Sequence, residues 1–189
     1  MRFIVCETVD QVRLGQALRY EVYCIEKGWI DPSTCDDGLE TDEYDRLAVH
    51  FLALDDEGTP VGTSRLLLGS RQILPAAKYL NLSSHGIAPG NVAEVSRLAA
   101  HETRRSQDLK VFLGLTKLMW VWGNERSMEA CAAIADVPLF GLLTRLGLPV
   151  ISMAPPIDYL GSKCIPVAFD VPGMGPALDR RGASELLAS

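Results

Sequence analysis

The sequence predicts a single α/β (α+β) domain in which helices pack on a mixed β-sheet. Two observations carry this prediction: an antiparallel hairpin, and the strand–helix–strand–helix order that follows it. The chain has 189 residues, of which 48% are hydrophobic, which suits one domain in the range of roughly 100–200 residues. We assign this domain to residues 1–170 and expect 171–189, rich in Gly, Ala and Arg, to be a poorly anchored tail.

The first half of the chain predicts a strand, a helix and the hairpin. Thr8 and Gln11 have the spacing of a capping box, and apolar residues recur at helical spacing up to Ile25. Residues 28–45 have no clear period, so we expect a long loop of the kind that is usually functional or disordered. The expected strands of this half lie over 1–6, 47–54 and 61–68.

The second half alternates strands with helices. A strongly amphipathic pattern predicts a helix over 106–124, with Leu109, Phe112, Leu113, Met119 and Trp120 on one stripe. Gly147 is expected to cap a second helix at its C-terminus. The other expected elements are a short helix over 74–80, a loop over 81–89, strands over 91–100, 131–135, 148–153 and 165–169, and the second helix over 138–146.

Composition narrows the classes of function. The net charge of −6 argues against nucleic acid as the main partner. No apolar run approaches the ~20 residues that span a bilayer, and the N-terminus is too short and too soon acidic for a signal peptide, so we expect a cytoplasmic protein.

Five scattered cysteines without a C-x-x-C pair indicate buried thiols in a reducing compartment. Three histidines without metal-ligand spacing predict no metal site, and no P-loop, GxGxxG or G-x-S-x-G motif occurs.

Two charges within the apolar strand over 91–100 are the most informative feature. Strand alternation would place Glu94 on one face with Ser96, and Arg97 on the other. Buried charges are costly unless they are paired or line a cavity. The segment therefore indicates either structural ion pairs or a functional site.

A second group lies on the first helix and just beyond it. Arg19 and Tyr23 are spaced i, i+4, and Trp29 follows the helix. Arg19 offers a fork for a carboxylate and the aromatic rings offer a wall for a ligand, although an arginine reaching solvent beside packed rings has the same pattern.

The acidic segment 36–45 and Arg65 form a third group. The spacing does not fit a calcium loop. A solvated loop is the ordinary interpretation; alternatively, carboxylates such as Asp42 and Asp45 orient Arg19 or Arg65, or receive an ammonium group. Arg65 is again a charge among apolar neighbours.

Together these residues resemble the acyl-homoserine-lactone synthase superfamily of GNAT-like acyltransferases over residues 1–170. Within it the chain is similar to N-acyl amino acid synthases of the exosortase-associated type. The residues that carry the resemblance are Arg19, Tyr23 (Phe in autoinducer synthases), Trp29, Glu40 to Asp45, Arg65, Glu94 to Arg97, and Pro155 to Gly161.

The resemblance implies a GNAT-like, mostly antiparallel sheet with splayed central strands that admit a pantetheine arm. It implies that Glu94 is the general base, with Arg97 supporting the ion network. Arg19, Tyr23, Trp29, Asp42, Asp45 and Arg65 would shape the acceptor side. A carboxylate in a desolvated cleft suits removal of a proton from an ammonium group before it attacks a thioester.

The implied donor is the phosphopantetheine thioester of acyl-carrier protein. Arg104 to Lys110 lacks the glycines that cradle the pyrophosphate of coenzyme A in acetyl-CoA-dependent relatives, so acyl-CoA is the less favoured donor. Arg104, Arg105 and Lys110 belong to a locally basic stretch suited to docking an acidic carrier, or to an ordinary solvated helix face. Candidate acyl-chain residues, which could equally be core, are Phe112, Leu115, Met119, Trp120, Phe140 and Leu143.

Three functions remain in competition. The first is transfer of a long fatty acyl group from acyl-carrier protein to the α-amine of an amino acid. The second is an acyl-homoserine-lactone synthase that uses S-adenosylmethionine. The third is a module that binds acyl chains or carrier protein without turnover, against which the pair Glu94 and Arg97 argues.

Overall fold

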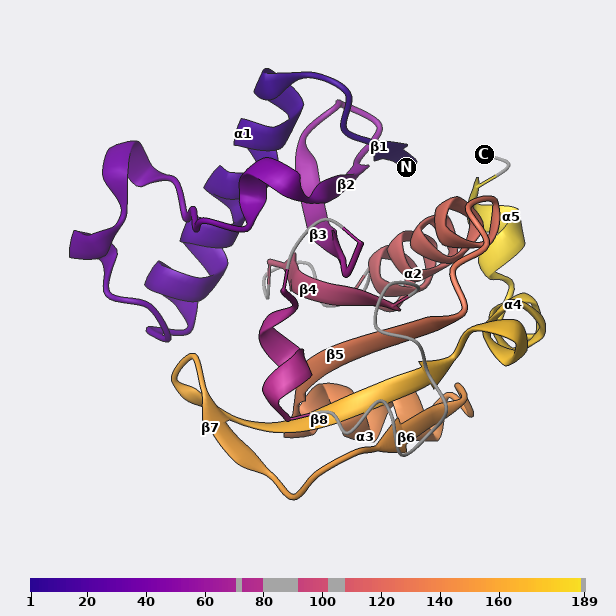
Figure 1. Cartoon of the computed structure of the whole chain (residues 1–189). Coiled ribbons are helices and arrows are strands. Elements are labelled where there is room, and N and C mark those ends of the chain that lie inside the picture. The colour runs from indigo at the N-terminus through magenta and orange to yellow at the C-terminus, as the bar shows by residue number, and fades with distance from the viewer. Residues whose placement is uncertain (71–72, 80–91, 102–107, 188–189) are drawn as a thin grey trace.

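A computed structural model describes residues 1–70, 73–79, 92–101 and 108–187 (Figure 1). Its strands form one sheet in the order β1-β2-β3-β4-β5-β8-β6, with β7 paired to β8. The strands are β1 (Arg2–Val5), β2 (Val49–Leu54), β3 (Pro60–Leu68), β4 (Val92–Ala100), β5 (Ala130–Asp136), β6 (Val150–Ser152), β7 (Ile157–Tyr159) and β8 (Ser162–Asp170). The α-helices are α1 (Val9–Arg19), α2 (Asp108–Asn124), α3 (Val137–Arg145), α4 (Val171–Asp179) and α5 (Ala183–Leu187).

Among the strands in the described residues, one pair, β4 and β5, runs parallel and the other pairs are antiparallel, so the sheet is mixed. This pair is in register only from Val92 with Ala130 to Val95 with Ala133. β4 nevertheless continues to Ala100 and β5 to Asp136. The two strands therefore splay apart after Val95, which confirms the GNAT-like sheet with an opening at its centre.

Helices cover both faces of the N-terminal half of the sheet. Gly15 of α1 sits against Thr63, and Gly62 sits against Val111 of α2. Because neighbouring residues of a strand point to opposite faces, α1 and α2 lie on opposite sides of β3. The face covered by α1 also carries the η helices described next, and we call it the α1 face.

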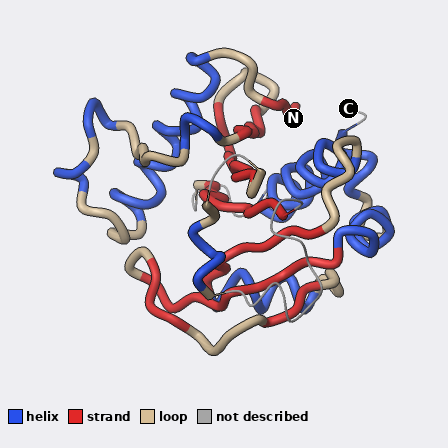
Figure 2. The backbone as a smooth tube through the Cα atoms, viewed as in Figure 1, coloured by secondary structure: helices blue, strands red, loops and turns tan. Residues whose placement is uncertain are grey.

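Short helical turns follow α1 and replace the uniform loop that we expected (Figure 2). The capping box of Thr8 and Gln11 begins α1 as predicted. The helix then widens into a π-helical segment, and the acidic stretch contains isolated 3₁₀ turns. These elements are η1 (Tyr20–Glu26), η2 (Pro32–Thr34), η3 (Asp36–Gly38) and η4 (Asp45–Leu47), with η5 (Pro75–Lys78) in the later connection.

The C-terminal tail corrects our expectation of a poorly anchored segment. Met174, Ala177 and Leu178 recur at helical spacing and are buried in a core shared with α2 and α3. Lys117 Nζ on α2 lies 2.6 Å from Asp179 Oδ1, and Trp120 Nε1 donates to the Val171 carbonyl at 2.9 Å. The Gly, Ala and Arg content led us to expect little anchoring, whereas the small residues allow close packing: a Cβ on Gly175 would lie 2.4 Å from Trp120.

Most other elements agree with the sequence within a few residues. The strand β7 was missed, and Leu109, which we placed on the apolar stripe of α2, is 46% exposed. The expected loop over 81–89 and the first residues of the helix predicted over 106–124 lie outside the described residues. In the described ranges, no helix is long and apolar enough to cross a membrane.

Candidate active site

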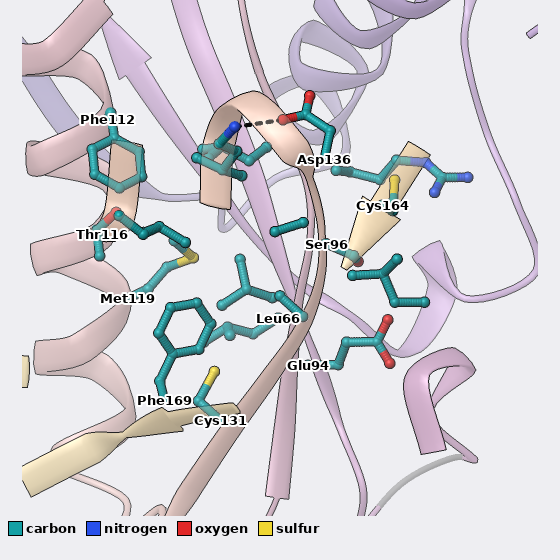
Figure 3. A pocket seen from close by; sticks show the side chains of 18 of the residues that line it. Leu66, Glu94, Ser96, Phe112, Thr116, Met119, Cys131, Asp136, Cys164 and Phe169 are labelled. Carbon is teal, nitrogen blue, oxygen red and sulfur yellow. Dashed lines mark hydrogen bonds between the residues drawn. The ribbon is translucent and has the colours of Figure 1, made fainter. Parts of the chain in front are cut away.

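A cavity occupies the opening between β4 and β5 and reaches both faces of the sheet. Glu94 shares the α1 face with Val92, which packs against η5. Val95 points to the opposite face and packs against the cores that α2 builds. Both line the cavity, together with Tyr23 on the α1 face and Met119 on α2. Figure 3 shows Phe112, Thr116 and Met119 on one side of the cavity, and Glu94 and Ser96 on the other. The opening therefore joins a polar chamber to an apolar one.

A β-bulge at Arg97 overturns the alternation that we predicted for β4. Arg97 has a positive φ of 54°, and the register with β3 shifts between the pairs Thr63–Ala99 and Arg65–Ser96. One extra residue in β4 thus stands opposite Ser64. The Arg97 side chain consequently turns to the same face as Glu94 and Ser96, where it meets the acidic segment.

Three arginines and three carboxylates form a buried network on the α1 face. Arg19 donates from both terminal nitrogens to Asp45, at 2.9 and 2.7 Å. Arg65 holds Asp42 in the same two-pronged manner, at 2.6 Å for each bond, and also bonds Asp45. Glu40 completes the network and is 2% exposed.

Arg97 joins this network from β4. Its Nε donates to Glu40 Oε1 at 2.9 Å and its Nη2 to Asp42 Oδ2 at 3.0 Å. Arg19 Nε lies 2.6 Å from Glu40 Oε2, but its N–H does not point along that line, so this is a charge contact rather than a hydrogen bond. Arg19 also donates to the Glu40 carbonyl. The three positive and three negative charges cancel, and the network ties the acidic segment to β3, β4 and α1.

This network limits what Arg19 and Arg65 do for a ligand. Their exposed fractions are 2% and 1%, and their guanidinium groups are occupied by carboxylates of the chain. Burial by itself would raise the pKa of Asp45, but the hydrogen bonds and charge of Arg19, together with Arg65, hold this pKa well below its usual value. Arg19 and Arg65 therefore leave no free fork for an incoming carboxylate.

Glu94 is a buried carboxyl group whose pKa lies above its ordinary value. Its side chain is buried, and Oε2 accepts a hydrogen bond from the Ala76 N–H of η5 at 2.8 Å. Burial raises the pKa of Glu94 to about 7, against the opposing effects of that hydrogen bond and of the Arg65 and Arg97 charges. Around neutral pH the carboxyl group is therefore divided between its acid and base forms.

Aromatic side chains and a hairpin enclose the polar chamber. Tyr23 stacks on Trp29 with ring centroids 5.7 Å apart, and its hydroxyl donates to the Leu98 carbonyl of the splayed part of β4 at 2.8 Å. The turn of the β7–β8 hairpin packs on Trp29, since a Cβ on Gly161 would lie 3.0 Å from the Trp29 Cα atom. Tyr159, on this hairpin, also lines the cavity.

Four of the six candidate acyl-chain residues line the apolar chamber, namely Phe112, Met119, Trp120 and Leu143. Leu115 instead packs fully buried in the core between α2 and β1–β3, because it lies on the side of α2 facing those strands. Phe140 packs at the edge of the core between α3 and β8. The sequence missed Val171 and Met174, which reach the chamber from α4; their helical spacing was the available signal.

The candidate carrier-docking residues are only partly described. Lys110 is exposed near the start of α2, and Arg104 and Arg105 lie outside the described residues.

Glu40 and Ala76 were absent from the predicted site. For Glu40 the available signal was its place in a run of acids opposite three arginines. Among described residues, no group of three His, Cys, Asp or Glu side chains could hold a metal ion.

The fold and the site define the chain as a GNAT-type acyltransferase. It belongs to the acetyltransferase (GNAT) domain family, whose model matches residues 18–114. It is also 37% identical over 86 residues to an acyl-homoserine-lactone synthase of Ralstonia solanacearum. That match spans 43% of this chain and 42% of the relative, which is less than half of either protein.

Solved structures extend the fold likeness to nearly the whole chain. TofI, in a ternary complex with an inhibitor and MTA, covers 95% of this chain and 97% of its own, with a TM-score of 0.77 and 22% identity. LasI, an AHL synthase, covers 94% of each chain, with a TM-score of 0.72 and 20% identity. BjaI, a CoA-dependent acyl-homoserine lactone synthase with SAM and isopentyl-CoA, covers 92% of this chain and 83% of its own, with a TM-score of 0.72 and 21% identity. The chain is thus a GNAT-family protein related to acyl-homoserine-lactone synthases.

Proposed function

We propose that the protein transfers a fatty acyl group from a thioester to the α-amine of an acceptor derived from an amino acid. One observation carries this proposal: a single cavity crosses the sheet at the β4–β5 opening, with Glu94 between a polar and an apolar chamber. An acyl chain in the apolar chamber and an amine in the polar chamber would meet beside that carboxylate. Holding two reactants in this way lowers the entropic part of the barrier.

The proposed mechanism needs one base and one oxyanion donor. Glu94 takes a proton from the acceptor ammonium, directly or through a water, and the free amine attacks the thioester carbonyl. A backbone N–H of β4 beyond Val95, where the strand has left β5, stabilises the developing oxyanion. The intermediate collapses to an amide and releases the thiol. Arg97 acts as a positioning residue that joins this part of β4 to Glu40 and Asp42.

S-adenosylmethionine is the first candidate acceptor. The Ralstonia solanacearum relative, LasI and BjaI are acyl-homoserine-lactone synthases, and BjaI was solved with SAM. In this reaction the amine of S-adenosylmethionine is acylated and lactone formation follows. The stacked Tyr23 and Trp29 offer the aromatic surface that a large, partly apolar acceptor needs.

A free amino acid is the second candidate acceptor, and the hairpin favours it. The β7–β8 turn packs directly on Trp29, which narrows the polar chamber and suits a compact acceptor. Tyr23 also differs from the phenylalanine of autoinducer synthases, and its hydroxyl fixes the position of the Leu98 carbonyl. The product would then be an N-acyl amino acid.

For the donor we propose acyl-carrier protein rather than acyl-CoA. This proposal is supported by the absence of glycine from Arg104 to Lys110, because a pyrophosphate cradle relies on close backbone approach. Exposed Lys110 on α2 would meet the acidic carrier. Kinetics with matched acyl-carrier and acyl-CoA thioesters test the preference, and equal kcat/KM values for both donors would contradict it.

Mass spectrometry of lipid extracts from bacteria that express the chain tests the whole proposal. The wild type should produce a new acyl amide, identified either as an acyl-homoserine lactone or as an N-acyl amino acid. Glu94→Gln should lower its formation by about 10²–10⁴-fold. Glu125→Gln is the matched control, since Glu125 is exposed and pairs only with its neighbour Arg126 among the contacts of the described residues.

The same pair of variants distinguishes an enzyme from a binding module. A module that holds acyl chains without turnover would yield no new amide, and its affinity for an acyl-pantetheine probe would be the same in wild type and Glu94→Gln. A loss of product smaller than tenfold in folded Glu94→Gln would refute the base role.

A further inference from the structure

Two free cysteines, neither of which has a role in the acyl-transfer proposal, meet beside the ion network. Cys24 of η1 and Cys35 have their Sγ atoms 3.6 Å apart. Cys35 lies between the 3₁₀ turns η2 and η3. By contrast, the thiols of Cys131 and Cys164 contact the carbonyls of Ala132 and Tyr159. The structure therefore pairs two sulfur atoms across two elements.

The geometry allows this pair to close into a disulfide. A disulfide has an S–S length of about 2.05 Å, so the two sulfur atoms must approach by roughly 1.5 Å. Cys24 is 4% exposed and fixed in the core, whereas Cys35 is half-buried in a segment whose neighbours, including Thr34 and Asp36, are exposed. The exposed η2–η3 segment is the side of the pair on which this approach has to take place.

The position of the pair gives such a bond a structural effect. Cys24 follows Tyr23, which stacks on Trp29 and bonds the Leu98 carbonyl. Cys35 lies five residues before Glu40, the first of the three carboxylates that bind the arginines. With both cysteines reduced, the backbone and non-covalent contacts hold the η2–η3 segment to η1. A covalent link would fix the outer part of the acceptor-side segment, which runs from Gly28 to Asp45.

We propose that Cys24 and Cys35 form a reversible disulfide that locks the acceptor-side segment onto η1. In a reducing compartment such bonds are usually transient or redox-sensing. The lock is a property of this segment and does not depend on which acyl acceptor the protein uses.

The oxidant is a low-molecular-weight disulfide such as oxidised glutathione. Burial raises the pKa of the Cys24 thiol to about 12, so the more accessible Cys35 reacts first. Its thiolate attacks oxidised glutathione, forms a mixed disulfide and releases one glutathione. The Cys24 sulfur, after losing its proton to solvent, then attacks the Cys35 sulfur and releases the second glutathione. Two protein thiols are oxidised and one glutathione disulfide is reduced to two thiols.

Intact-mass analysis and tryptic mapping of the full chain test the bond. Oxidation should remove about 2 Da, the mass of two hydrogen atoms, and dithiothreitol should restore it. Trypsin cuts after Arg19, Lys27 and Arg46, so the oxidised protein should give peptide 20–27 linked to peptide 28–46. Cys35→Ser should abolish the linked peptide, and Cys131→Ser should leave it unchanged.

Hydrogen exchange measures the lock itself. Deuterium uptake by residues 28–46, read after the disulfide is reduced under quench conditions, should be slower by roughly threefold or more in the oxidised than in the reduced wild type, with no such difference in Cys35→Ser. Three results would each overturn the proposal. The first is linkage of Cys24 or Cys35 to another cysteine, and the second is a glutathione adduct on Cys35 that does not go on to form the Cys24–Cys35 bond. The third is unchanged hydrogen exchange in protein that contains the linked peptide. Because no substrate is used, failure here would leave the acyltransferase proposal unaffected.

Discussion

Replacing Glu94 by glutamine should make the folded protein more stable at alkaline pH while it removes the proposed base. A carboxyl group whose pKa is raised by folding binds its proton more tightly in the folded state than in the unfolded state. Its contribution to stability is fully present below the unfolded pKa and is lost as pH rises through the folded pKa. For Glu94 this window runs from the ordinary value of 4.5 to about 7.

The size of the effect follows from that window. The difference between the ordinary pKa of 4.5 and the pKa of about 7 in the folded protein corresponds to about 3 kcal/mol of stability lost above neutral pH. Glutamine keeps the size of the side chain and an oxygen that accepts from the Ala76 N–H, but it carries no charge. Glu94→Gln should therefore match the wild type near pH 4 and exceed it by about 3 kcal/mol at pH 8.

Urea unfolding followed by tryptophan fluorescence measures this difference at several pH values. Glu125→Gln again serves as the control, because its side chain is 64% exposed and its removal should give no growing difference with pH. A stability gain that is the same at pH 4.5 and pH 8, or a variant less stable than the wild type at both, would refute the argument that burial raises this pKa.

Three further variants test other parts of the site. Asp45→Asn should destabilise the fold by about 3–5 kcal/mol in urea titrations, because it leaves a buried network with one uncompensated positive charge. The control Asp158→Asn changes an exposed side chain and should leave the unfolding midpoint unchanged. Equal effects of the two substitutions would contradict the role of the buried network. Tyr23→Phe should cost about 1 kcal/mol by the same assay, since the Leu98 carbonyl loses its donor; no loss would show that water replaces it. Gly175→Ala should cost about 1–3 kcal/mol, measured by thermal unfolding, because the new methyl group meets the Trp120 ring; a neutral result would show that the ring moves freely.

The sequence predicts this fold wherever local chemistry decides the structure. The capping box at Thr8, the hairpin of β2 and β3, and Gly147 after α3 with its positive φ of 65° are all confirmed. Each depends on side chains within a few residues of one another. The order of these elements then restricts the sheet to a mixed topology.

The sequence fails where one residue changes the geometry or where distant segments meet. Strand alternation placed Arg97 away from Glu94, but a bulge with a positive φ at Arg97 reverses its direction. No local pattern indicates this bulge, because the energy that holds it comes from Glu40 and Asp42, more than fifty residues earlier. The docking of α4 on Trp120 is likewise a long-range contact. The sequence therefore named many of the site's residues but not their arrangement.

The charges of the ion network act on the pKa of Glu94. Arg65 and Arg97 both lower the pKa of Glu94, and Asp42 raises it. Without Asp42, the Arg65 and Arg97 charges would act on Glu94 unopposed and would lower its pKa further. Asp42 counters these charges, and burial remains the largest influence on the pKa of Glu94. Through Asp42, the acidic segment therefore helps to keep the pKa of a carboxyl group on another strand raised, which is what the proposed base role needs.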